Sequence, residues 1–138
     1  MQISINGVDH TLRFGLKFIR ELDKKYYFEK NGVKFGATLE DRVPLIFSRD
    51  PVTLSDFLYS ATSTEENRPT RDQIDTYIEE CEDIDKLFEE VLSELKNSNV
   101  TRSRVEQMEA LLSMMKEIQA EEKNGKKPKS PPKKPTKN

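Results

Sequence analysis

The sequence predicts an α+β domain in which an N-terminal β-hairpin packs on a mainly α-helical bundle, followed by a disordered basic C-terminal tail. An Asn-Gly pair between two short apolar segments predicts the hairpin. Apolar residues at helical spacing through most of residues 14–120 predict the bundle. A final stretch of Lys, Pro, Ser and Gly without a large apolar residue predicts disorder. We therefore divide the chain into a folded domain, residues 1–122, and a tail, residues 123–138.

Composition predicts a small core and a heavily solvated surface, because the 138 residues are 34% hydrophobic and 35% charged. Seven lysines and no acid lie in residues 123–138, so residues 1–122 carry 16 basic and 25 acidic side chains, a net charge of −9. The chain has one cysteine, no signal-like N-terminal segment, and no apolar run near the ~20 residues of a membrane span. These features predict a soluble protein of a reducing cytoplasm.

The first element is a hairpin of Gln2–Ile5 and Val8–Arg13, joined at Asn6-Gly7, where both residues tolerate the positive φ of a two-residue turn. Its register should leave one apolar face that closes onto the following helix, made of Ile3, Ile5, Val8 and Leu12. His10 lies opposite Ile3, on or beside that face. With no second histidine in the chain, we interpret His10 as a packed or edge residue.

A helix over residues 14–27 is expected to form the spine of the core. Its apolar residues gather on one side of a helix: Phe14, Phe18, Ile19, Leu22 and Tyr26. A second turn follows at Asn31-Gly32, and then a helix from Thr38 to about Phe47 despite Pro44. The next helix should be capped at Thr53, with an apolar stripe of Leu54, Phe57, Leu58 and Ala61.

A strict heptad-like spacing follows a capping pattern of Thr70 with Gln73. It comprises Ile74, Tyr77, Cys81, Ile84, Phe88, Val91 and Leu95. Either one long helix spans it, or Asp83 caps a second helix after a break at Glu82-Asp83. Cys81 on this seam is expected to be buried and inert. Residues 72–94 hold ten acids and one base, which predicts a solvated face or, alternatively, a negative surface for a basic partner.

The last helix is expected over residues 100–120 and is rich in methionine. Its apolar side includes Leu112 and a set that we call the methionine stripe, the candidate partner-binding residues Met108, Leu111, Met114, Met115 and Ile118. Methionine adapts to irregular apolar partners. Two interpretations stay open: the stripe packs on the protein's own core, or it binds a partner chain.

Motifs for catalysis or ligand binding are missing from the sequence. It has no Gly-rich phosphate loop, no nucleophile elbow, and no second His or Cys to complete a dyad or a metal site. We therefore predict no enzyme, no catalytic, cofactor-binding or metal residues, and no cofactor. The lysine tail lacks aromatic residues and arginine for stacking or base readout, so nucleic acid is an unlikely partner, and no membrane partner is expected.

Four segments together resemble the tail assembly chaperones of long-tailed bacteriophages, especially those of Gram-positive hosts. They are Phe14-Gly-Leu-Lys-Phe-Ile-Arg-Glu-Leu-Asp-Lys-Lys-Tyr26, Asn31-Gly-Val-Lys-Phe-Gly36, Ser60-Ala-Thr62 and Asp75–Asn97. The likeness covers roughly residues 1–100. It implies a non-enzymatic protein of the host bacterial cytoplasm that binds and solubilises the tape measure protein. It also implies recruitment of the major tail (tube) protein, absence from the mature virion, and a longer form made by translational frameshifting.

Two other functions remain open from the residues alone. One is a small nucleic-acid-binding or regulatory protein that acts through the lysine tail. The other is a structural head–tail connector component. Self-association through the heptad-like seam is a further option, since the same seam would suit a second copy of the chain.

Overall fold

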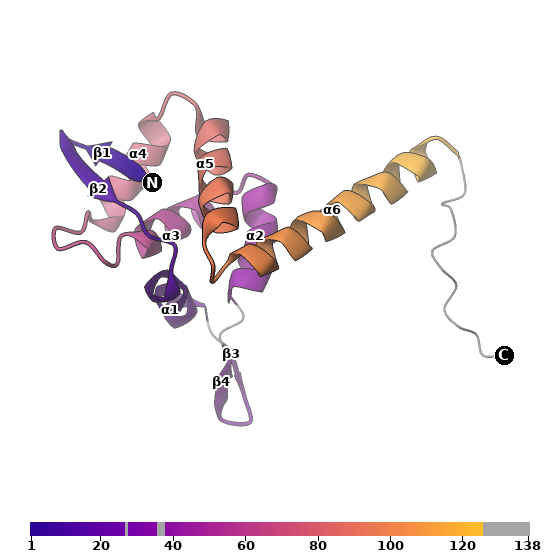
Figure 1. Cartoon of the computed structure of the whole chain (residues 1–138), viewed down its shortest axis with the longest axis horizontal. Coiled ribbons are helices and arrows are strands. Elements are labelled where there is room, and N and C mark those ends of the chain that lie inside the picture. Colours follow the sequence, from indigo (N-terminus) through magenta and orange to yellow (C-terminus); the bar gives the residue numbers. More distant parts are fainter. Residues whose placement is uncertain (27, 36–37, 126–138) are drawn as a thin grey trace.

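The computed structural model describes residues 1–26, 28–35 and 38–125 and confirms the α+β fold, with an N-terminal hairpin on a helical body (Figure 1). The predicted disorder of the tail falls almost wholly on residues 126–138, which lie outside the described residues. The elements in chain order are β1 Gln2–Ile5, β2 Val8–Thr11, α1 Leu16–Lys25, β3 Phe28–Lys30, β4 Val33–Phe35, α2 Thr38–Phe47, α3 Pro51–Ala61, α4 Arg71–Glu80, α5 Ile84–Asn97 and α6 Arg102–Lys123.

The β1–β2 hairpin has the predicted register, with Ile3 opposite His10 and the Asn6-Gly7 turn at positive φ. Ile3, His10 and Leu12 are buried, but Val8 is 51% exposed, so its assignment to the buried face is wrong. Val8 adjoins the turn, at the end of the hairpin where the core stops. The hairpin lies beside α4 rather than along α1, as Figure 1 shows. The N-terminal ammonium group reaches Glu94 of α5 at 3.2 Å.

Helix α3, and not α1, is the centre of the core. Eight of its eleven residues are buried, and it contacts α1, α2 and α4. The predicted α3 stripe is completely buried: Leu54, Phe57, Leu58 and Ala61. Helix α1 contributes Phe18 and Leu22, and the Phe18 ring meets the Phe57 ring edge to face at a centroid distance of 5.4 Å. The cap of α3 is Asp50, whose carboxylate accepts the Thr53 N–H, so the prediction that the helix begins with Thr53 as its cap is wrong.

The heptad-like segment forms two helices, so the option with a break is the observed one. Helix α4 begins with the predicted reciprocal cap between Thr70 and Gln73, and α5 begins with Asp83, which accepts the Lys86 N–H. The break interrupts the seam. Ile84 is 37% exposed, and Cys81, at the end of α4, is half-buried rather than buried as expected.

A second hairpin, β3–β4, turns at Asn31-Gly32 with both residues at positive φ. Helix α2 follows it and contains Pro44, and its Leu39, Val43 and Ile46 are buried in the same core as the other helices. Within the described residues, none of the helices has the length and apolarity needed to cross a membrane.

Candidate functional site

Helix α6 is anchored to the body only through its first half. Thr101, just before the helix, is buried and donates a hydrogen bond to the Leu95 carbonyl at 2.5 Å. Val105 is fully buried. Ion pairs join Arg104 to Glu40 of α2 at 2.9 Å and Lys96 of α5 to Glu109 at 2.7 Å. The rest of the helix extends away from the body (Figure 1), so α6 is a rod fixed at one end.

The methionine stripe lies mostly on the projecting part of this rod. Met108 packs partly against the core, but Leu111, Met114, Met115 and Ile118 are 44–59% exposed. In the single chain, therefore, these four side chains do not pack on the protein's own core. Helical geometry places Ser113, Lys116 and Ala120 on the opposite side of the rod, and all three are exposed. The projecting half of α6 thus has one apolar side and one polar side, and partner binding by the stripe stays a prediction.

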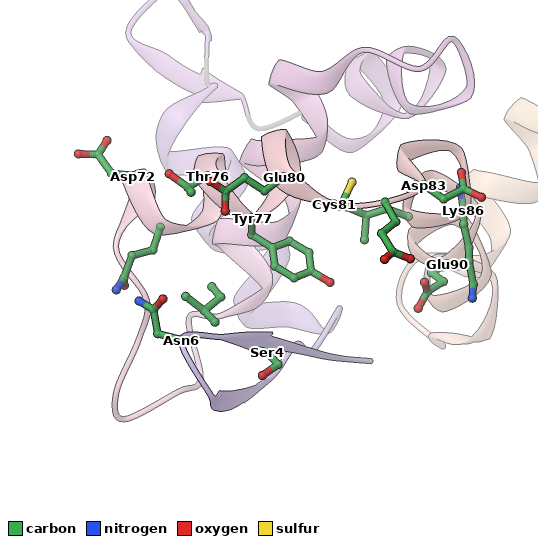
Figure 2. Close-up of a pocket in the computed structure, with 14 residues that line it drawn as sticks. Ser4, Asn6, Asp72, Thr76, Tyr77, Glu80, Cys81, Asp83, Lys86 and Glu90 are labelled. Atoms are coloured by element: carbon green, nitrogen blue, oxygen red, sulfur yellow. The ribbon is translucent and has the colours of Figure 1, made fainter.

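A cavity of about 860 Å³ lies between the first hairpin turn and helices α4 and α5 (Figure 2). Ser4 and Asn6 line it from the hairpin, and Tyr77 faces it from α4. Burial, with a contribution from Glu90, raises the pKa of Tyr77. The remaining lining is dominated by acids, with Lys86 as the base: Asp72, Glu80, Glu82, Asp83 and Glu90. No group of His, Cys, Asp and Glu among the described residues is arranged to hold a metal ion.

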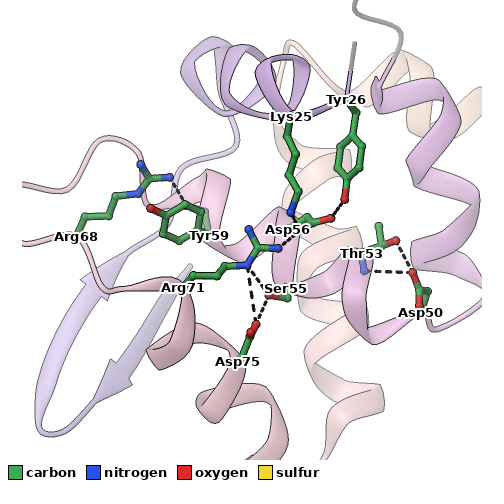
Figure 3. A network of polar contacts seen from close by, with 10 residues as sticks. All are labelled: Lys25, Tyr26, Asp50, Thr53, Ser55, Asp56, Tyr59, Arg68, Arg71 and Asp75. Carbon is green, nitrogen blue, oxygen red and sulfur yellow. Dashed lines mark hydrogen bonds and ion pairs between the residues drawn. The ribbon is translucent and has the colours of Figure 1, made fainter. Parts of the chain in front are cut away.

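A partly buried polar network joins α1, α3 and α4 (Figure 3). Asp56 is 1% exposed, and its carboxylate accepts hydrogen bonds from Lys25, at 2.8 Å, from the Tyr26 hydroxyl and from Arg71. Arg71 also donates to Ser55 at 3.1 Å. A buried carboxylate with three donors is a structural clamp, because its partners compensate its loss of water. Asp56 could not be singled out from the sequence, because nothing local in the sequence indicates that this carboxylate is buried.

Arg68 makes a second clamp, between α1 and the end of α3. Its guanidinium donates to Glu21 at 2.8 Å and to the Tyr59 carbonyl at 2.9 Å, and it lies over the Tyr59 ring. Partial burial alone would raise the pKa of Glu21, but the charge and hydrogen bond of Arg68 outweigh it, so the pKa lies below its ordinary value. Both clamps hold the helices of the body together.

Comparison with known proteins identifies the family of the chain. No curated protein and no solved structure matches the chain. The family model described as "Phage tail assembly chaperone protein, TAC" matches residues 2–109, which comprise the whole body and the anchored start of α6. Of the methionine stripe, only Met108 lies in the matched region. With most of its length matched, the chain belongs to the phage tail assembly chaperone family.

Proposed function

We propose that this chaperone binds and solubilises the tape measure protein during tail assembly, and that the methionine stripe is its binding surface. The observation that carries the proposal is the exposure of four large apolar side chains in a row on a helix that extends from the body. Contiguous exposed apolar surface of this kind marks interaction sites in soluble proteins. The family gives the setting, tail assembly, and the stripe gives a surface suited to a protein client.

The chemistry of the stripe fits an apolar helical client. Its residues recur at helical spacing, so they can interdigitate with a second helix laid along α6. Two of the four exposed residues are methionines, whose flexible side chains adapt to a surface that varies along a long client. The net charge of −9 over residues 1–122 helps to keep such a complex in solution.

The wider role that we propose follows from the family. The protein acts in the host bacterial cytoplasm. It is displaced from the tape measure protein as tail-tube subunits assemble around that protein, and it is absent from the mature virion. Recruitment of the tube subunits is a second part of this role. The cavity between the hairpin and helices α4 and α5 is the second surface to test for that step, since none of the residues that line it belongs to α6.

Co-expression with the tape measure protein of the same phage tests the proposal. Three versions of the full chain are compared: wild type, the stripe variant L111Q/M115Q/I118Q, and a control, A110Q/S113Q/A120Q, in which three exposed residues of the opposite side are changed. Wild type and control should keep the tape measure protein soluble and co-purify with it. The stripe variant should fold normally but lose both effects. Equal protection by all three versions would exclude the stripe as the binding surface.

A further inference from the structure

In the free protein, the projecting half of α6 leaves an apolar stripe uncovered. Residues 111–123 extend past the body over about 20 Å at 1.5 Å per residue. The centre of the stripe lies about a third of a turn from the direction of Val105, the residue that faces the body. A second helix can therefore lie on the stripe without displacing α2 or α5.

The stripe is complementary to itself in the antiparallel direction. A two-fold axis between Met114 and Met115 places Leu111 of one copy against Ile118 of the other. Leu111 and Ile118 form the midline of the stripe, and Met114 and Met115 flank it on either side. Each of the four exposed apolar residues on one helix thus meets an apolar residue on the other, as a closed dimer requires.

Charge and shape also favour the antiparallel arrangement. The body is joined to α6 at one end only, so a parallel pair would place two bodies side by side, each within a region of net charge −9. An antiparallel pair places the bodies at opposite ends. It also brings Glu122, on the stripe side near the end of one helix, toward Arg104, on the same side near the start of the other.

We propose that, without a client, two copies of this chain pair antiparallel through the methionine stripe and that the tape measure protein displaces the second copy. The second part rests on the proposed function, but the pairing does not. The stripe spans only eleven residues and is rich in methionine, so the pairing is reversible. Self-association would thus protect the same apolar surface that later receives the client.

Analytical ultracentrifugation of the full chain tests the pairing in the absence of any client. The mass of wild type and of the control A110Q/S113Q/A120Q should rise from monomer to dimer with concentration. The variant L111Q/M115Q/I118Q should weaken dimerisation at least tenfold while its circular dichroism spectrum stays helical. A wild type that remains monomeric, or a stripe variant that dimerises as strongly as wild type, would overturn the pairing.

Disulfide trapping tests the direction. Two single-cysteine proteins, L111C and I118C, are made in a C81S background to remove the native thiol. Mixed and oxidised, they should give mainly the 111–118 disulfide, because the antiparallel pair places these positions together. Mainly 111–111 and 118–118 products would show a parallel pair and overturn the proposal.

A trapped dimer that leaves the stripe intact, Q107C/E122C in the C81S background, tests displacement, because the antiparallel pair also places these two exposed positions opposite each other. Oxidised, it should fail to hold the tape measure protein in solution, and reduction should restore the activity. Failure in both states would count against the proposed function, whereas the mass and cross-linking results would still decide the pairing. Full activity of the oxidised dimer would overturn the claim that pairing and client binding use one surface.

Discussion

The body of this chaperone and the projecting half of α6 use apolar residues in opposite ways. In the body, Phe18, Phe57 and Phe88 are buried almost completely in the same core of apolar side chains. On α6, Leu111, Met115 and Ile118 occupy the same kind of helical stripe but remain 44–49% exposed. Helical periodicity alone therefore does not distinguish apolar residues that pack in the core from exposed apolar residues that we propose bind a partner.

The family match follows the same division. It covers residues 2–109 and so ends where α6 leaves the body. The body is thus the part that identifies the protein, and the stripe beyond it is the part for which we propose client binding. The following substitutions compare how much the residues of the body and of the projecting half of α6 contribute to the stability of the fold.

The largest effect is expected from truncation in the core. Replacing Phe57 with alanine should lower the free energy of unfolding by about 3–5 kcal/mol, because the cavity cannot close around a lost ring. The matched change on the rod, Met115→Ala, should alter stability by no more than about 0.5 kcal/mol. Urea unfolding followed by circular dichroism measures both. Comparable losses would show that the stripe is part of the core.

Loss of the Asp56 clamp should cost less. Asp56→Ala leaves Lys25 and Arg71, both partly exposed to water, without their shared carboxylate and should destabilise the body by about 1–3 kcal/mol. Asp85→Ala is the control, since Asp85 is 75% exposed beside Arg49 and should contribute less than about 1 kcal/mol. If the two variants unfold at the same urea concentration, the network does not clamp α1, α3 and α4.

A smaller effect is expected at the break between α4 and α5. Asp83→Ala removes the acceptor for the Lys86 N–H and should cost about 1 kcal/mol. Asp83→Asn retains an acceptor there and should recover most of it. If both variants match wild type in urea unfolding, the cap is not what starts α5.

The smallest effect concerns acid stability. The pKa of Glu21 is lowered in the folded state, so its ionised form adds stability above the ordinary value of 4.5, and this is lost as pH falls through the lowered pKa. The variant E21Q lacks this contribution. Its stability deficit against wild type should therefore shrink as the pH is reduced from about 6 to about 3. A deficit that stays constant over this range would show that Arg68 does not act through the charge of Glu21.

Much of the fold could be predicted because its signals are local. The Asn6-Gly7 turn fixes the hairpin register. Thr70 and Asp83 mark the starts of α4 and α5, because the side chain of each accepts a hydrogen bond from the backbone N–H three residues later. The central place of α3 could not be predicted in this way. Its buried side includes Ser55 and Asp56, whose burial depends on partners from α1 and α4.

The residues of the candidate site could be predicted from the sequence, but their exposure on the surface could not. The spacing of Leu111, Met115 and Ile118 indicates an apolar side of a helix. Whether that side meets the body depends on the direction in which α6 leaves it, which the contacts of Val105, Arg104 and Glu109 decide. Such long-range contacts have no local signal.

Hydrogen–deuterium exchange on the full chain, free and in complex with the tape measure protein, tests the central claim most directly. The free chain is measured at a concentration at which it is monomeric. We expect residues 111–118 to exchange rapidly in the free chain and to become protected in the complex, with little change in α3. Protection confined to the body, for instance around the cavity beside Tyr77, with no change in residues 111–118, would contradict the assignment of client binding to the methionine stripe.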